Sequence, residues 1–221
     1  MCFFCGTDVH HKKHIEAFGD KIKIKNLDPL KTIHKILLIL SGVLLLLTIK
    51  LPIWRIELDA AQYPEGLELL IHSNKLAGQV DIINGLNHYI GMKTLHADDF
   101  IEFKVLPYIL GAFALAFIYV GIRGRQRALK ILFIAFVLFG IVAMVDFWIW
   151  EYNYGHDLDP NAPIKVPGMA YQPPLIGFKQ LLNFGAYSVP DIGGWIIVGA
   201  GAVLLYCLAS EWKTNRKKST L

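Results

Sequence analysis

Four long apolar segments constrain the fold of this chain more than any other feature. They cover about residues 33–54, 105–122, 129–150 and 192–209. Each approaches the ~20 residues that a helix needs to cross a bilayer. Hydrophobic residues make up 54% of the 221 positions and the mean hydropathy is +0.44, so little sequence remains for a soluble domain. We therefore expect an all-α membrane protein with four transmembrane helices, in which residues 1–28 form a basic cytoplasmic arm and residues 29–221 form the membrane domain.

Lysine and arginine gather in three places along the chain. They precede the first apolar segment, separate the second from the third and follow the fourth, as at Lys12, Lys31, Arg123, Arg127, Lys213 and Arg216. Basic residues beside transmembrane helices stay in the cytoplasm, so we expect both termini there and residues 55–104 and 151–191 outside. The net charge of +4 then reflects topology, and nucleic acid is a poor candidate for a partner.

The two outer segments are expected to contain structure of their own. In the first, apolar and polar residues alternate over Trp54–Leu58 and Leu67–Ile71 around the turn sequence Tyr63–Gly66, which predicts a short β-hairpin. A helix is expected to follow over Asp81–Tyr89. Proline interrupts helices and central strands, so we expect the second segment to be an ordered, extended cover. That segment holds six of the ten prolines, Pro160, Pro163, Pro167, Pro173, Pro174 and Pro190.

The first outer segment also carries a possible metal site. His88, Met92 and His96 follow one another at four-residue intervals, and on an α-helix they would share one face. A glycine just before Met92 could instead end the helix and leave the last two in a loop. Imidazole and thioether are ligands that copper accepts. Because the second outer segment adds His156 and Met169, we expect a copper site at the outer face; the alternative is that these are ordinary surface residues.

A second possible metal site lies in the N-terminal arm. Cys2 and Cys5 have the spacing with which two thiolates bind one ion, and His10 or His14 could complete a tetrahedral zinc or copper site. A redox-active dithiol and an arm without a specific role are the alternatives.

Asp146 is an acid within the third apolar segment, about one turn from its outer end. Acids inside a membrane are functional candidates, so Asp146 either contacts the outer segments or belongs to a metal or proton path.

Three short sequences carry a resemblance to a known family. They are Tyr63–Leu67, Leu86–Met92 and Tyr154–Pro163. These short sequences resemble those of small multi-span membrane proteins encoded in bacterial nitrous-oxide reductase gene clusters, beside copper-chaperone and maturation components. The similarity covers about residues 50–195. It implies a bacterial inner membrane location, and copper delivery to a periplasmic enzyme or assembly of that enzyme.

These observations together predict the function. We expect an accessory membrane protein that binds copper at its outer face and assists maturation of a periplasmic copper enzyme, with that enzyme or a copper chaperone as partner. A metal-free assembly partner or a small transporter subunit is the alternative. The sequence lacks the hydrolase motifs G-x-S-x-G and H-E-x-x-H and has no paired cysteines in its outer segments, so we do not expect an enzyme.

Overall fold

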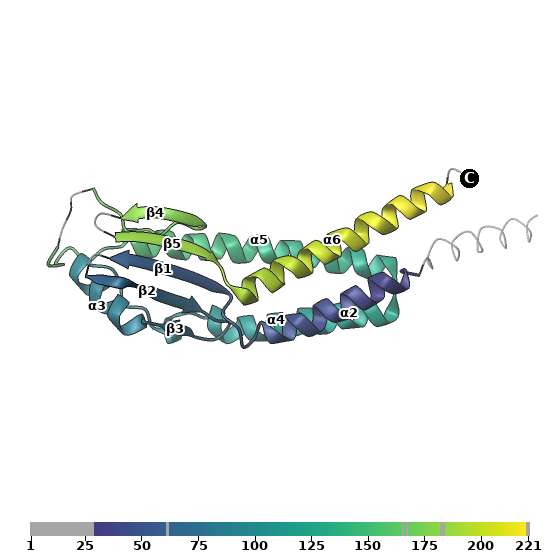
Figure 1. Cartoon of the computed structure of the whole chain (residues 1–221), viewed down its shortest axis with the longest axis horizontal. Coiled ribbons are helices and arrows are strands. Elements are labelled where there is room, and N and C mark those ends of the chain that lie inside the picture. Colours follow the sequence, from purple (N-terminus) through teal and green to yellow (C-terminus); the bar gives the residue numbers. More distant parts are fainter. Residues whose placement is uncertain (1–28, 61, 165, 167, 182–183, 220–221) are drawn as a thin grey trace, which may run out of the picture.

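The computed structural model describes residues 29–219, apart from positions 61, 165, 167 and 182–183. It contains the helices α2 (Thr32–Leu47), α3 (Val80–Ile90), α4 (Glu102–Arg123), α5 (Gln126–His156) and α6 (Ile192–Ser219). The molecule is elongated, with α2, α4, α5 and α6 packed along its length and α3 at one end beside a β-sheet (Figure 1). The start of α2 and the end of α6 lie at the opposite end (Figure 1).

The expectation of an all-α fold with four spans is wrong. Within the described residues the protein has five helices and a five-stranded antiparallel sheet, with 59% helix and 18% strand. By length and composition this is a membrane protein, because α4, α5 and residues 192–214 of α6 are long and apolar enough to cross a bilayer. The segment over residues 33–54 instead forms the 16-residue α2, about 24 Å long at 1.5 Å per residue. Pro52 cannot continue a helix, and Trp54 is already the first residue of a strand.

The sheet is built from both outer segments. Its strands are β1 (Trp54–Ala60), β2 (Tyr63–Ile71), β3 (Leu76–Gly78), β4 (Gly177–Leu181) and β5 (Phe184–Pro190). Their order is β3-β2-β1-β5-β4, and every pairing is antiparallel. The predicted hairpin of β1 and β2 is confirmed, although Tyr63 and the residues after it belong to β2 and not to the turn.

The expectation that the proline-rich segment has no central strand is wrong. β5 lies between β1 and β4, because the first five prolines, through Pro174, precede β4 and Pro190 ends β5. In this segment each proline therefore precedes a strand or ends one, as its missing N–H requires.

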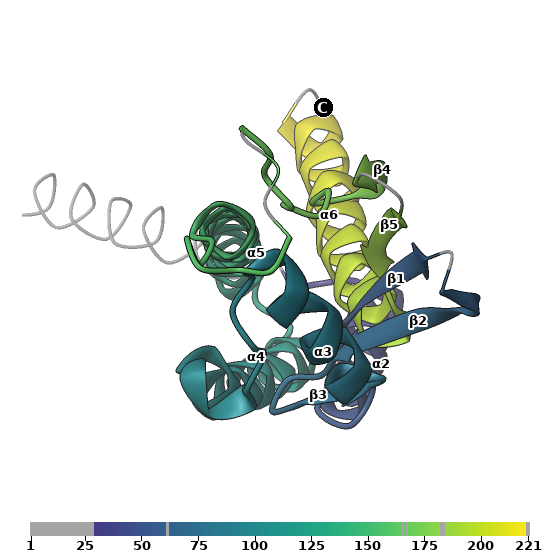
Figure 2. The same cartoon turned by 90° about the vertical axis from the view of Figure 1, so that its left-hand side faces the viewer.

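Two hydrophobic clusters hold the described residues together. Leu38, Phe117, Leu129, Phe136 and Leu204 are among the side chains that join α2, α4, α5 and α6. The second cluster, which we call the lobe core, packs the inner face of the sheet against α3 and the end of α5; it includes Trp54, Ile56, Leu67, Leu69, Ile83, Met92, Tyr154 and Tyr171. Viewed from that end, α3 lies between the sheet and the helices α4 and α5 (Figure 2). The sheet, α3 and the end of α5 thus form one packed lobe.

Candidate functional site

The two outer segments meet within the lobe. The side-chain amide of Asn87, near the end of α3, donates a hydrogen bond to the hydroxyl of Tyr154 on α5. Lys93 Nζ lies 2.5 Å from a carboxylate oxygen of Asp157. Backbone hydrogen bonds of 2.8 and 2.9 Å run from Asp159 to Gly91 and from Ile164 to Tyr89. These contacts fix the region after α3 against the region after α5.

The structure divides the residues of the predicted outer-face copper site between the surface and the lobe core. His88, His96 and His156 are exposed, and His156 has its Nδ1 atom 2.8 Å from the carbonyl of Tyr152. Met92 is buried in the lobe core, and Met169 packs against the same core. Because α3 ends at Ile90, the single helical face considered for His88, Met92 and His96 does not form.

The metal predictions are neither confirmed nor contradicted. In the part of the chain that the structure describes, no three side chains of His, Cys, Asp or Glu converge to hold a metal ion. The copper site with methionine ligands therefore stays a prediction. Cys2, Cys5, His10 and His14 lie outside the described residues, so the zinc site of the N-terminal arm stays a prediction too. Asp146 is exposed on α5, and its proposed roles also stay open.

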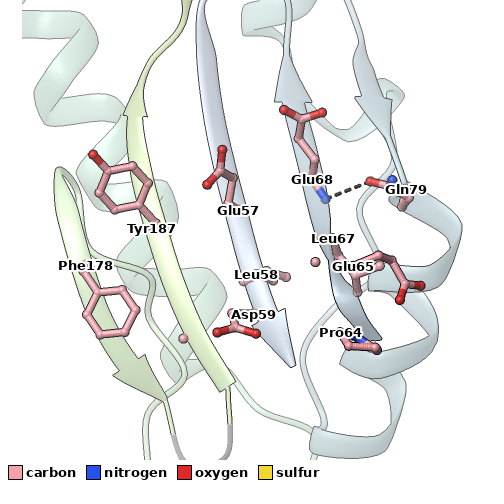
Figure 3. A pocket seen from close by; sticks show the side chains of 12 residues that line it. Glu57, Leu58, Asp59, Pro64, Glu65, Leu67, Glu68, Gln79, Phe178 and Tyr187 are labelled. Carbon is pink, nitrogen blue, oxygen red and sulfur yellow. Dashed lines mark hydrogen bonds between the residues drawn. The ribbon is translucent and has the colours of Figure 1, made fainter. Parts of the chain in front are cut away.

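The outer face of the sheet carries a hollow of about 590 Å³. Phe178 pairs with Tyr187, Tyr187 with Glu57, and Glu57 with Glu68, so one row of side chains crosses β4, β5, β1 and β2. Two aromatic rings thus lie beside two carboxylates (Figure 3). The rings are well exposed, Phe178 at 63% and Tyr187 at 42%. We call these four residues the aromatic–acidic row.

The hollow keeps a net negative charge. Like charges directly opposite on neighbouring strands repel each other, and Arg55 reduces this repulsion because its guanidinium lies 3.3 Å from Glu57 and 3.6 Å from Glu68. Asp59 and Glu65 line the same hollow and add two carboxylates to that pair. Four acids therefore line the hollow, and Arg55 forms ion pairs with two of them.

A glycine positions the ring of Phe178. A Cβ atom on Gly185 would lie only 2.6 Å from the Phe178 ring, so the ring rests directly over the backbone of β5. Proteins usually protect the edge strands of a sheet, and an exposed apolar patch commonly marks a site where another molecule binds. β4 is an edge of the sheet, and its exposed Phe178 makes this face a candidate for a binding surface.

Sequence reasoning missed a buried, hydrogen-bonded Glu–His pair at the other end of the molecule. Glu211 on α6 has one carboxylate oxygen 2.6 Å from Nδ1 of His34 on α2, and His34 is 1% exposed. The same oxygen accepts a hydrogen bond from the backbone N–H of Lys31 at 3.1 Å. Its other oxygen accepts one from Gln126 of α5, also at 3.1 Å. Both acid and base lie in or next to apolar segments, which is the signal that could have identified them.

Sequence reasoning also missed Glu151, near the end of α5. Its side chain is 0% exposed, and neither carboxylate oxygen has a hydrogen-bond partner among the described residues. The hydroxyl of Tyr171, 2% exposed, likewise has no partner in the described part of the chain. Glu151 follows the apolar segment that contains Asp146, so the argument applied to Asp146 would have identified it.

Comparisons with known proteins add no relative. No family model, curated protein or solved structure matches the chain.

Proposed function

We propose that this protein is a membrane-anchored accessory protein whose lobe docks a positively charged segment of an extracytoplasmic partner. The observation that carries this proposal is the aromatic–acidic row in its open hollow. A lysine or arginine side chain suits such a surface, because its charge is attracted both by carboxylates and by the faces of aromatic rings. Each exposed contact contributes only about 0.5–1 kcal/mol, so the row favours an extended segment with several contacts over a single ion.

The charge of the two ends supports an extracytoplasmic lobe. Arg123, Arg125 and Arg127 flank the connection between α4 and α5, at the end of the molecule away from the lobe (Figure 1). Basic residues favour the cytoplasmic side, which leaves the sheet and α3 outside. With the resemblance to proteins of nitrous-oxide reductase clusters, this orientation favours a bacterial inner membrane and a periplasmic partner.

Cysteine labelling tests the orientation. In a protein whose own cysteines have been replaced, a cysteine at exposed Gln62 in the sheet lobe should react with a membrane-impermeant maleimide in intact cells. A cysteine at exposed Arg127 should react only after the membrane is permeabilised. The reverse pattern would place the lobe in the cytoplasm and contradict a periplasmic partner.

Photo-crosslinking in cells tests the docking surface itself. The resemblance makes a periplasmic copper enzyme, such as nitrous-oxide reductase, or its copper chaperone the expected partner. A photoreactive residue in place of Tyr187 should crosslink to it, whereas one in place of Tyr89, which is 56% exposed elsewhere on the lobe, should not. Equal crosslinking at both positions, or none at Tyr187, would contradict docking at the aromatic–acidic row.

Copper handling is the second candidate function, and the positions of the methionines favour it. Met92 belongs to the lobe core, and both Met169, from the other outer segment, and Met144 of α5 pack against that core. Thioether sulfur is a ligand that Cu(I) prefers. A lobe that holds copper and also docks a periplasmic enzyme would deliver the metal where that enzyme matures. Copper analysis of the purified membrane protein, with and without Met92→Leu, tests this candidate.

A further inference from the structure

The position of Glu151 in the lobe is settled by its neighbours on α5. Met144, Phe147 and Tyr154 stand seven and four residues before it and three after it, and all three pack in the lobe core. Residues at these spacings share one face of an α-helix. The buried carboxylate of Glu151 therefore faces the lobe core and not the membrane.

Tyr171 reaches the same region from the second outer segment. Its backbone N–H donates a hydrogen bond of 2.9 Å to the carbonyl of Gly155, one helical turn after Glu151. A Cβ atom on Gly155 would lie 2.3 Å from Cα of Gln172, so the segment lies directly on the helix. Two buried oxygen-bearing groups without partners in the described residues thus face one apolar cluster.

A charged carboxylate in this place needs a positive partner. An ionised acid without one is very costly to bury. The charge of Lys179 acts on Glu151, but the Lys179 side chain is exposed and its ammonium donates to the carbonyl of Gln172 at 3.0 Å. Within the described residues, no hydrogen bond or salt bridge compensates Glu151. A proton or a bound cation is therefore required.

The methionines of the lobe core favour one class of cation. Three of the four methionines of the chain, Met92, Met144 and Met169, pack in the lobe core. Hard ions such as Mg²⁺ and Ca²⁺ need a shell of oxygen ligands, whereas Cu(I) accepts thioethers. A single negative charge also matches the single positive charge of Cu(I), which leaves a neutral site in a region that excludes water.

We propose that Glu151 is the anionic ligand of an interior Cu(I) site, in which methionine thioethers of the lobe core supply the remaining coordination. Met92, Met144 and Met169 are the candidates, because Met92 belongs to the lobe core and the other two pack against it. This inference rests on the copper-handling candidate. It places the copper site at Glu151 and not at the surface histidines.

Cu(I) titration of the purified full-length protein against a chromophoric chelator, under reducing conditions, tests the site. Glu151→Gln and Met144→Leu keep the size of each side chain, and both should weaken Cu(I) binding at least tenfold. Glu102→Gln, which removes an exposed carboxylate at the start of α4, is the matched control and should leave binding within twofold. Wild-type affinity in Glu151→Gln would overturn the proposal.

Two further measurements keep the proposal testable if Glu151→Gln fails to fold. X-ray absorption of wild-type protein with one Cu(I) bound should show sulfur neighbours, and Met144→Leu should reduce their number; a spectrum without sulfur would overturn the interior site. If His88→Ala with His96→Ala abolishes Cu(I) binding while Glu151→Gln preserves it, the copper role survives at the surface and the interior site is wrong. Crosslinking at Tyr187 is independent of every one of these results.

Discussion

The two ends of the molecule each bury a glutamate, but only one of them has hydrogen-bond partners among the described residues. At the end away from the lobe, both carboxylate oxygens of Glu211 contact hydrogen-bonding groups, namely His34, Gln126 and the backbone N–H of Lys31. In the lobe, neither oxygen of Glu151 has a partner among the described residues. Burial alone therefore does not distinguish a structural acid from a candidate ligand; the satisfaction of its hydrogen bonds does.

The partners of Glu211 give it a structural role. They come from α2, the segment before α2 and α5, so the carboxylate on α6 joins three helices. Tyr206 of α6 adds an edge-to-face contact with the His34 ring at 5.7 Å between centroids. A network of this kind is strongly destabilised when one member is removed, because the others stay buried without a partner.

The largest change in stability is expected for substitution of Glu211, whose carboxylate has hydrogen-bond partners. Glu211→Ala should lower the free energy of unfolding in detergent by about 3–5 kcal/mol, the usual cost of leaving one member of a buried pair alone. Denaturant titration followed by tryptophan fluorescence measures this change. His34→Ala should cost a similar amount, and the double variant should cost much less than the sum of the two. Additive effects would show that the pair does not act as one unit.

The next effect appears in the lobe only when copper is added. At a free Cu(I) concentration about 100 times the dissociation constant, binding to the native state should stabilise wild-type protein by about 2.7 kcal/mol. Glu151→Gln should lose most of this stabilisation, whereas Glu211→Gln should keep it. Thermal unfolding with and without Cu(I) is the measurement. Equal stabilisation of both variants would remove the distinction between the two glutamates.

The exposed acids of the aromatic–acidic row form a third case, between the two buried ones. Glu57 has a salt bridge to Arg55, but both side chains are partly exposed, so solvent weakens the contact. Tyr187→Ala should weaken binding of the periplasmic partner about tenfold, or about 1.4 kcal/mol, by removing the ring next to Glu57. Binding of the purified partner at low and high salt measures this, with Tyr89→Ala as control. An unchanged affinity would contradict docking at the row.

The helices were more predictable from the sequence than the sheet. The apolar segments at 105–122, 129–150 and 192–209 each lie within an observed helix, because about 20 consecutive apolar residues leave few alternatives. The prediction of a span over 33–54 was wrong, because hydropathy does not show that the helix ends at Leu47 and that a strand begins at Trp54. The pairing of β5 with β1 joins residues more than 120 positions apart, and such long-range pairing leaves no local pattern.

The candidate sites were predictable only in part. The short-range pattern of His88, Met92 and His96 was visible, but the end of α3 turns Met92 inward while the histidines stay at the surface. The aromatic–acidic row could not be found, since its four residues come from four strands whose register was unknown. Glu151 and Glu211 look alike in the sequence, and only their neighbours in space distinguish them.

The smallest expected effect is the change in stability of Glu151→Gln without copper, and it tests the contrast between Glu151 and Glu211 most strictly. Without copper, Glu151 must be protonated or bear an unbalanced charge, and glutamine has nearly the same shape without that charge. Glu151→Gln should therefore change the free energy of unfolding by less than about 1 kcal/mol, or raise it, as when buried charges are replaced by neutral groups. The measurement is denaturant unfolding of copper-free protein beside Glu211→Gln, which alters the buried contact with His34 and should be the less stable variant. If Glu151→Gln is instead the less stable of the two, then Glu151 is part of the lobe's structural framework, and the contrast between a satisfied and an unsatisfied glutamate does not separate structure from function.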